Sequence, residues 1–500
     1  MAVVGSDGRS AAPHVPRPEP VASATSPRLE RLAAEVAAGD GGALARFWSE
    51  AAAGGGPLVE PVAAPGEGRG VGRYAVTFLW RDRDPAAADA RTGAAETRTR
   101  GVAVLVNRLS DPRLVENAAM RRLAGTDVWF RSFLLDGDWR GSYHLLVDDH
   151  RTPLPEPPAG LDPRRARALL RHAVPDPLNP RRLPSRWGGP GVSVAELPAA
   201  PALGEWRRRP GVPAGLLTEH AVDSDALGER RRVWAYTPPA GAVAAGARLP
   251  VLVLLDGEMW GPRLSVATLL DNLVAERRLP PLLALLPDSV DVGTRARDYG
   301  CDASFTDFLH RELLPWAERH LGATSDPAAT VVAGESFGGL AALFAALRAP
   351  ERFGNVLAQS ASLWFRPPAP QAGPRGTGQR ETGPWETGER EAGRREAEPD
   401  AGSGEWLTER FAEASGAGGA AGRVRFHLRV GRLEWQLLPP NRRLRRVLEA
   451  AGRRVTLTEY NGGHDYACWR GGLTDGLVEL LGAGDAARPA DPADAAPRAG

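Results

Sequence analysis

Short apolar runs rich in Val, Leu and Ala recur along the second half of the chain, and amphipathic stretches lie between them. This alternation predicts a mostly parallel sheet covered on both faces, because parallel strands need helical crossovers. The predicted strands are residues 232–236, 249–255, 282–286, 330–333, 356–359, 424–430 and 455–460. The predicted helices are residues 267–276, 305–321, 340–347 and 442–451. Residues 216–482 are therefore expected to form a domain of the α/β class.

The region before this domain has a different pattern, in which short strands follow one another without helices between them. Strands are predicted at 74–80, 101–106, 128–134 and 143–147, with turn sequences such as Asp136-Gly137-Asp138. Together with two short helices at about 27–38 and 44–53, they predict an all-β sandwich domain over residues 27–150. Residues 151–215 carry many prolines and no regular period, so we expect a connector there.

Three segments lack the apolar residues that a packed core needs. Residues 1–26 are rich in Pro, Ala and Ser, and residues 367–404 repeat Glu-Thr-Gly and Glu-Arg-Glu units. Residues 483–500 have a similar bias. We expect a disordered amino-terminal tail, a disordered low-complexity insertion and a disordered carboxyl-terminal tail.

Composition narrows the class of protein only slightly. The 500 residues are 43% apolar and 25% charged, as in globular proteins, and the net charge of +1 gives no reason to expect nucleic acid or an anionic membrane as a partner. All basic residues are Arg, so the abundance of Arg is not itself a functional signal. Two cysteines, no apolar leader and no run of 18 apolar residues predict a cytoplasmic protein without a membrane span.

The most specific chemical signal is Gly-Glu-Ser-Phe-Gly-Gly at residues 334–339, between a predicted strand and a predicted helix. A serine flanked by glycines at such a turn is the nucleophile elbow of an α/β-hydrolase. The turn raises the Ser336 hydroxyl above the sheet and directs the backbone N–H of Phe337 at the developing oxyanion. The pattern predicts an α/β-hydrolase domain with Ser336 as nucleophile; a plain glycine-rich turn is the alternative.

In this fold the base follows the nucleophile and the acid in the chain. Only two of the nine histidines follow Ser336. His427 lies within a predicted strand, where a packed side chain is expected. His464 lies in an Asn-Gly-Gly-His-Asp loop after the last predicted strand, which is the position of a catalytic base.

The acid should follow the preceding strand, and Glu434 lies just past residues 424–430. Glu449 on a helix, Glu459 inside a strand and Asp465 beside the histidine are poorer candidates. The second oxyanion donor should follow an early strand, and the backbone N–H of Glu258 is the first choice there.

Seven segments carry a resemblance to a known family. Those in the α/β domain are 254–260, 334–339, 350–354 and 462–473, and those upstream are 125–129, 139–143 and 176–180. Together they resemble the enterochelin (ferric enterobactin) esterases. The resemblance spans roughly residues 30–482. It implies a cytoplasmic esterase that opens the serine trilactone of an iron-loaded catecholate siderophore, with the iron as part of the substrate and no cofactor. Ser336 and His464 match the family's nucleophile and base, and Glu434 falls where the family has a glutamate.

A ferric tris-catecholate is a trianion with flat rings, so its pocket should hold arginines and aromatic residues. Arg295 and Arg297 are expected in a loop after strand 282–286, and Arg295 matches an arginine of the family. Trp260 and Trp364 follow strands on the same side of the sheet. The alternatives are solvated surface arginines and tryptophans packed in the core.

The sequence is compatible with alternatives for the two cysteines and for the function. The resemblance carries both Cys301 and Cys468, which either lie close together or are unconnected buried thiols. The competing enzymatic hypothesis is a general carboxyl or feruloyl esterase, although such enzymes lack the upstream domain. The non-enzymatic hypothesis is a catalytically idle siderophore-binding protein.

Overall fold

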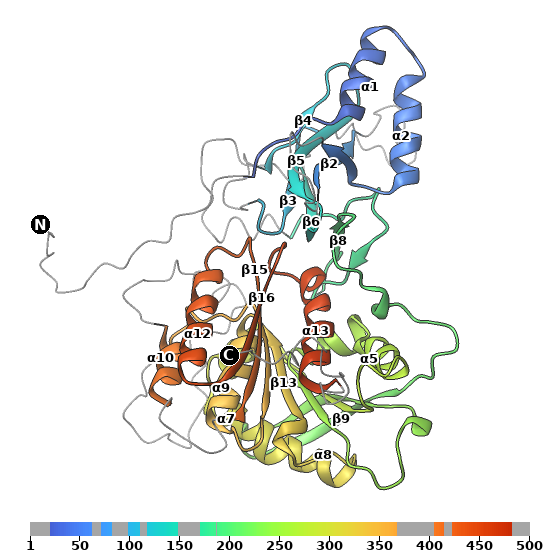
Figure 1. The fold of residues 1–500 in the computed structure, drawn as a ribbon. Helices are drawn as coiled ribbons and strands as arrows, with labels where there is room; N and C mark the ends of the chain where they lie inside the picture. Colours follow the sequence, from blue (N-terminus) through green and yellow to red (C-terminus); the bar gives the residue numbers. More distant parts are fainter. Residues whose placement is uncertain are drawn as a thin grey trace, which may run out of the picture.

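The structure is a computed structural model that describes residues 21–62, 72–82, 99–110, 118–148, 171–186, 188–367, 405–414 and 423–482. Most of the three segments expected to be disordered (1–20, 368–404 and 483–500) lies outside these residues. The described residues form an antiparallel sandwich domain (residues 21–197) and a hydrolase domain (residues 216–482), stacked one above the other in Figure 1.

The sandwich domain has two four-stranded sheets, as the alternating short strands predict. One sheet has the order β1 (Leu58–Val62), β2 (Arg73–Arg81), β5 (Val128–Asp136), β4 (Arg121–Arg122). The other has the order β3 (Gly101–Val106), β6 (Arg140–Asp148), β8 (Val192–Glu196), β7 (Arg182–Leu183). Buried side chains from both sheets, including Phe78, Val104 and Leu145, form the core between them. Helices α1 (Pro27–Ala37) and α2 (Ala43–Gly54) pack a second small core against Leu79.

The boundaries of this domain differ from the sequence prediction at both ends. Residues 21–26, expected within the disordered tail, lie along β5: the Ala24 N–H donates to Ser132 O, and the Ser26 side chain caps α1. The segment expected to be a connector contributes β7 and β8 to the second sheet. Both strands are short and lie beside turns in a proline-rich stretch, so neither shows the alternation of apolar and polar residues by which a strand is predicted.

The hydrolase domain is built on an eight-stranded sheet with the order β16-β15-β14-β13-β11-β12-β10-β9. The six strands from β16 to β12 pair in parallel, and β10 and β9 are antiparallel. The strands are β9 (Leu216–Ser224), β10 (Glu229–Thr237), β11 (Val251–Leu254), β12 (Leu283–Pro287), β13 (Thr330–Glu335), β14 (Asn355–Gln359), β15 (Arg425–Gly431) and β16 (Arg454–Tyr460). The α/β-hydrolase architecture preceded by an all-β sandwich is therefore confirmed.

Helices cover both faces of this sheet (Figure 1). They are α5 (Val266–Ala275), α6 (Val292–Tyr299), α7 (Ala303–Asp307), α8 (Leu314–His320), α9 (Phe337–Arg348), α10 (Trp406–Glu413), α12 (Leu438–Ala450) and α13 (Tyr466–Leu481). Two π-helical segments, η4 (Met259–Arg263) and η5 (Phe308–Leu313), also occur. The central strands are buried on both faces, which explains their continuous apolar sequences.

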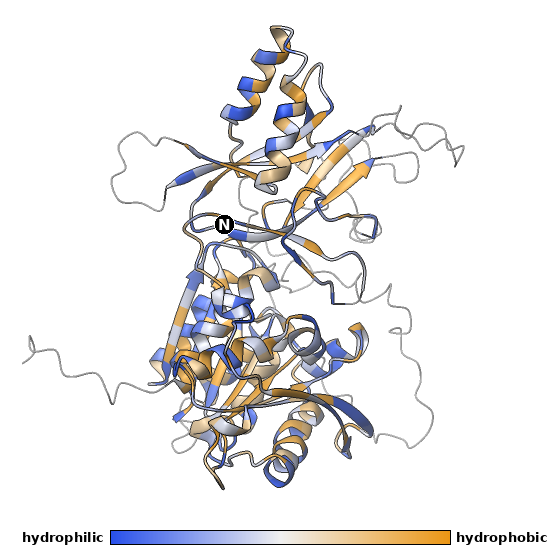
Figure 2. Ribbon diagram, turned by 90° about the vertical axis from the view of Figure 1, so that its right-hand side faces the viewer, coloured by the Kyte–Doolittle hydropathy of each residue, from blue (hydrophilic) through white to orange (hydrophobic). Residues whose placement is uncertain are grey.

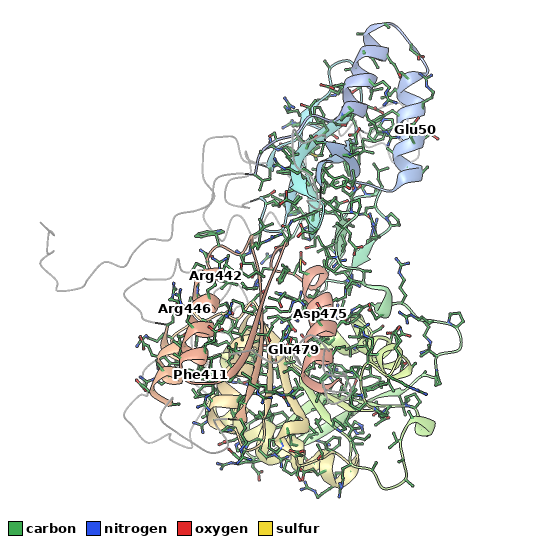
Figure 3. All side chains as sticks on the ribbon, viewed as in Figure 1. Glu50, Phe411, Arg442, Arg446, Asp475 and Glu479 are labelled. Carbon is green, nitrogen blue, oxygen red and sulfur yellow. The ribbon has the colours of Figure 1, made fainter. Side chains whose placement is uncertain are left out.

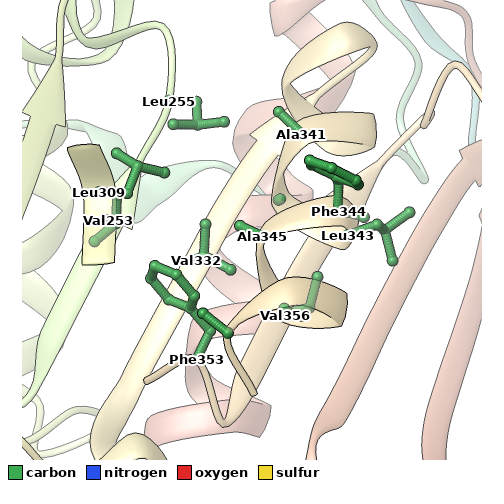
Figure 4. Close-up of a cluster of buried hydrophobic side chains, with 14 of the residues drawn as sticks. Val253, Leu255, Leu309, Val332, Ala341, Leu343, Phe344, Ala345, Phe353 and Val356 are labelled. Carbon is green, nitrogen blue, oxygen red and sulfur yellow. The ribbon is translucent and has the colours of Figure 1, made fainter. Parts of the chain in front are cut away.

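The core on one face of the sheet fixes the helix that follows the predicted nucleophile. Leu343 and Ala345 of α9 pack with Val332 of β13 and Val356 of β14 (Figure 4). Figure 2 shows the same arrangement as hydrophobic strands enclosed between helices. Burial of this apolar surface, at about 25 cal/mol per Å² removed from water, holds the start of α9 against the end of β13.

The sandwich domain lies over the end of the sheet at which β15 and β16 finish (Figure 1). The Arg140 N–H of β6 donates to Asn461 O at 3.2 Å. Asp138 accepts hydrogen bonds from Asn461 Nδ2 at 2.6 Å and from Arg432 Nη2 at 2.9 Å. The two domains therefore meet at the loop that follows β16.

Candidate active site

Ser336 lies between the last residue of β13 and the first residue of α9. Its backbone has φ 58° and ψ −119°, a region that a residue with a side chain rarely occupies. A Cβ on Gly334 would lie 2.5 Å from the backbone of Gly338, so only glycine fits two residues before the serine. The strand, tight turn and helix that the sequence predicts are all present.

Glu434 and His464 meet, although they are separated by a helix and a strand. Glu434 follows β15, His464 follows β16, and His464 Nδ1 lies 2.7 Å from Glu434 Oε2. The Glu434 side chain is completely buried, and that of His464 is 20% exposed. A buried carboxylate that binds Nδ1 selects the tautomer in which Nε2 is a proton acceptor.

The second oxygen of Glu434 is also well supplied with donors. Oε1 accepts hydrogen bonds from Gly431 N–H at 2.8 Å and Ser360 Oγ at 2.7 Å, and the Tyr460 hydroxyl lies 2.8 Å away. Burial alone would raise the pKa of Glu434, but the charge and hydrogen bond of His464, with a contribution from Arg108, outweigh it and lower the pKa. Glu434 is therefore held as a carboxylate.

The Ser336 hydroxyl lies beside another serine and not beside the predicted base. Ser336 Oγ lies 3.3 Å from Ser362 Oγ, and no hydrogen bond joins it to His464 in the described part of the chain. The His464 ring packs edge-on against Trp469, with the ring centroids 4.8 Å apart. Trp469 in turn donates from Nε1 to Ser360 Oγ at 3.0 Å, so it links the histidine to the residues around Glu434.

The other candidate histidine has a structural role. His427 is buried in β15, and its Nδ1 lies 2.7 Å from the carboxylate of Glu479 on α13. Arg429 of the same strand pairs with Asp475, one turn earlier on α13, and Figure 3 labels both acidic residues along that helix. These contacts fasten α13 to the sheet, as the packed-side-chain reading of His427 requires.

Both predicted oxyanion donors lie at helix starts. Phe337 is the first residue of α9, and Glu258 immediately precedes η4. Amide groups at a helix start have no partner inside the helix, so they are available to an anion. The Glu258 side chain points elsewhere: its Oε1 accepts from Ser289 Oγ at 2.7 Å.

Arg295 is placed differently from the prediction. It lies on helix α6 rather than in a loop, because Asp291 caps that helix by accepting from Thr294 N–H. Its Nε and Nη2 bind the completely buried carboxylate of Asp256 at 2.7 and 2.9 Å. Arg186 of the sandwich domain binds the same carboxylate at 2.9 and 2.6 Å. Asp256 therefore joins both arginines, and no sequence pattern identified Arg186.

Arg297 also lies on α6, and its side chain is 58% exposed. It pairs with Asp298 at 2.9 Å. A guanidinium this exposed gains little from its pairing and is accessible to a ligand.

The two predicted tryptophans have opposite environments. Trp260 has no exposed surface and donates from Nε1 to Glu335 Oε2 at 3.0 Å, so it is a core residue and not a substrate contact. Trp364 is half-buried and lies edge-on to Phe337, with ring centroids 5.6 Å apart, while Phe365 lies 5.1 Å from Phe337. Because Phe337 follows Ser336, these three rings form an aromatic cluster beside the predicted nucleophile.

The two cysteines are free thiols. Burial raises the pKa of Cys301 to about 12, and burial with the charge of Asp465 raises that of Cys468. Cys468 Sγ donates to the Arg140 carbonyl at the interface of the two domains. Both side chains are therefore protonated, unconnected packing groups.

Within the described ranges, every helix is too short or too polar to span a lipid bilayer.

Two family models match the chain. The model for the amino-terminal region of enterochelin esterases matches residues 75–206, and the putative esterase model matches residues 224–480. The chain is thus an esterase of the α/β-hydrolase class whose sandwich domain is that of the enterochelin esterases.

Relatives match over nearly the whole chain. The iron(III) enterobactin esterase of Dickeya dadantii is 35% identical over 87% of this chain and 92% of that protein. The iron(III) salmochelin esterase of Escherichia coli O6:H1 is 33% identical over 91% of this chain and 98% of its own. The crystal structure of the Shigella flexneri enterobactin esterase in the presence of enterobactin has a TM-score of 0.63 at 29% identity, covering 87% and 97%. The chain belongs to the iron(III) enterobactin esterase family, which confirms the resemblance seen in its motifs.

Proposed function

We propose that this protein hydrolyses the serine trilactone esters of an iron-loaded catecholate siderophore such as ferric enterobactin. One observation carries the proposal: a serine in a strained strand-to-helix turn and a histidine bound to a buried carboxylate each follow a strand of one sheet, β13 and β16. The family of the chain directs this ester chemistry to a siderophore. Iron enters only as part of the substrate, and no resident cofactor is proposed.

In the proposed reaction, Ser336 Oγ attacks the ester carbonyl carbon while His464 Nε2 takes the hydroxyl proton. The amides of Phe337 and Glu258 stabilise the oxyanion, each contributing roughly 3 kcal/mol. The ester C–O bond then breaks, and His464 returns the proton to the departing serine alkoxide of the siderophore. Water attacks the acyl-enzyme by the same route and restores Ser336. Glu434 holds the His464 tautomer and stabilises the imidazolium ion.

Substrate recognition is proposed for the aromatic cluster and the exposed arginine of α6. The half-buried ring of Trp364 offers a face to a catechol ring, and Arg297 offers a positive charge to the trianion. Arg295 is excluded from direct contact in this proposal, because Asp256 occupies its guanidinium edge.

We propose the cytoplasm as the site of the reaction, where released iron can be reduced. The two free, buried thiols support a reducing compartment.

The decisive experiment is mass spectrometry of the products after incubation with ferric enterobactin, with p-nitrophenyl butyrate as a neutral ester. Linear and shorter 2,3-dihydroxybenzoyl-serine products are expected from the native chain and not from Ser336→Ala, which should bind the ferric siderophore unchanged. Rapid turnover of the neutral ester alone would favour a general carboxyl or feruloyl esterase. Tight binding without any products would favour an idle binding protein. A Ser336→Ala variant that keeps more than about a hundredth of the native kcat would exclude Ser336 as nucleophile.

A further inference from the structure

We infer that the sandwich domain positions the catalytic histidine of the hydrolase domain, and that Asn107 is the positioning residue. The inference rests on the proposed function, in which His464 is the base. Asn107 directly follows β3 and is separated from His464 by 357 residues of sequence. It acts on catalysis through the backbone of His464 and not by touching the substrate.

The contact between them has two points. Asn107 Oδ1 accepts a hydrogen bond from the His464 N–H at 2.7 Å, and Asn107 Nδ2 donates to the His464 carbonyl at 3.2 Å. One amide side chain thus satisfies both peptide groups of the histidine. Among the described residues, the hydrolase domain makes no hydrogen bond to either group. The main chain of the proposed base is therefore held by the neighbouring domain.

Asn107 is itself fixed by the next strand of its sheet. Its N–H donates to the Ser142 carbonyl on β6 at 2.9 Å. Ser142 also binds Asp465 Oδ2, through its N–H at 2.8 Å and its hydroxyl at 2.6 Å. Asp465 Oδ1 caps the start of α13 by accepting from Cys468 N–H at 3.1 Å. Two neighbouring strands of the sandwich domain therefore hold two successive residues of the hydrolase loop.

The residue before the histidine allows this close approach. A Cβ on Gly463 would collide with Asn107 Oδ1 and would lie 3.0 Å from the Asn107 carbonyl. Only glycine lets the two backbones come this near. From the hydrolase side, Glu434 fixes the ring of His464 and the Tyr460 hydroxyl lies 3.0 Å from the Gly463 carbonyl. Asn107 adds the hydrogen bonds to the N–H and the carbonyl of His464 itself.

Without Asn107, the backbone of His464 should be held less tightly, while its ring keeps the hydrogen bond to Glu434. A displacement of about 1 Å in a catalytic group can cost on the order of 100-fold in rate. Asn107 contacts the backbone of His464 and not the substrate. The loss should therefore appear in kcat on every ester, including a small neutral one. KM should change little.

The test is a double-mutant cycle with Asn107→Ala and His464→Ala on p-nitrophenyl butyrate, with melting temperatures recorded for all variants. Asn107→Ala should lower kcat by about 10- to 100-fold at unchanged KM, and it should have no further effect in the His464→Ala background. Asp138→Ala is the matched control, since it removes contacts to Asn461 and Arg432 at the same domain interface without touching His464. It should keep at least half of the native kcat.

Each result has a defined meaning. If His464→Ala keeps most of its activity, the proposed triad fails. If His464→Ala is inactive but Asn107→Ala is not impaired, the triad stands and the positioning role is overturned. Equal losses from Asn107→Ala in both backgrounds, or from Asp138→Ala, would also overturn it. If Asn107→Ala does not fold, Asn107→Asp carries the same cycle, because a carboxylate still accepts from the His464 N–H but loses the donor to the His464 carbonyl. A loss of at least about threefold that vanishes in the His464→Ala background is then expected, and a smaller loss, or one that persists there, overturns the role.

Discussion

Arg295 binds the buried carboxylate of Asp256 through two parallel hydrogen bonds, of 2.7 and 2.9 Å. Arg186 binds the same carboxylate from the other domain, and together the two arginines lower the pKa of Asp256 against the effect of its burial. The charge of Arg295 therefore stabilises a buried anion at the end of β11. This assigns to Arg295 a structural role in place of the predicted contact with the substrate.

Arg295→Ala should therefore destabilise the protein instead of changing its selectivity. Removing one partner of a buried ion pair costs up to about 3–5 kcal/mol, and the remaining Arg186 should reduce this loss to about 2 kcal/mol. Urea unfolding measures the loss directly. Activity should fall by similar factors on the ferric siderophore and on p-nitrophenyl butyrate.

Arg297→Ala is the control on the same helix, because its side chain is 58% exposed. It should leave stability nearly unchanged and raise KM for the ferric trianion only, by an effect that shrinks with added salt. If Arg295→Ala instead gives the selective, salt-sensitive defect, the original prediction of a substrate contact is right.

Glu434→Gln should lower kcat by on the order of 10³- to 10⁴-fold with little change in fold. The glutamine carbonyl can still accept from Gly431 and Ser360, but its NH₂ group would face His464 Nδ1 and force the wrong tautomer. Steady-state kinetics on a neutral ester measures the effect.

Glu459→Gln is the matched control, since Glu459 lies on the neighbouring strand and pairs with Arg442 at the surface. Near-native activity is expected from it. A Glu434→Gln variant within tenfold of the native kcat would show that another carboxylate serves His464.

The triad candidates could be predicted because their signals are local. A strand, a glycine-flanked serine and a helix are contiguous at Ser336, and Glu434 and His464 each follow a strand of the same parallel sheet. Parallel strands finish at one edge, so residues that follow them meet there without further information. The same logic could not distinguish Trp260 from Trp364, because only packing decides that one is enclosed and the other half-buried.

The contacts between the domains could not be predicted in this way. Asn107 and Arg186 occupy unremarkable loop positions, and their partners lie in a different domain. The short strands β7 and β8 were also missed, because their two and five residues are too few to show alternation among prolines. The contacts of Asn107 and Arg186 depend on the way two folded surfaces meet.

Trp364→Ala should weaken binding of the ferric siderophore about tenfold, measured as KM or as Kd in a Ser336→Ala background. An aromatic contact contributes about 0.5–1.5 kcal/mol beyond its area, and Trp364→Phe should retain most of it. Trp316 is another half-buried tryptophan, and it packs against His220. The variant Trp316→Phe is therefore the control for a general loss of stability. An equal change in KM for p-nitrophenyl butyrate would place Trp364 in the structural frame of the site.

Glu335, the residue before the nucleophile, should make stability depend on pH. Burial, together with the neighbouring charge of Asp256, raises the pKa of Glu335 from 4.5 to about 8. Between these values the folded protein holds a proton that the unfolded chain has released. The free energy of unfolding should therefore fall as the pH rises from 4.5 through 8, by up to about 1.4 kcal/mol per pH unit.

Glu335→Gln removes this titrating group and should flatten the dependence. Urea unfolding of the native protein and the variant at pH 6 and pH 9 isolates the contribution, since all other groups titrate equally in both. Glu459→Gln, which removes a carboxyl whose pKa its hydrogen bond with Arg442 lowers, should keep the native slope over this range. Identical slopes for Glu335→Gln and the native protein would mean that Glu335 is ionised beside Asp256, with the charges of Arg186 and Arg295 shared between the two carboxylates.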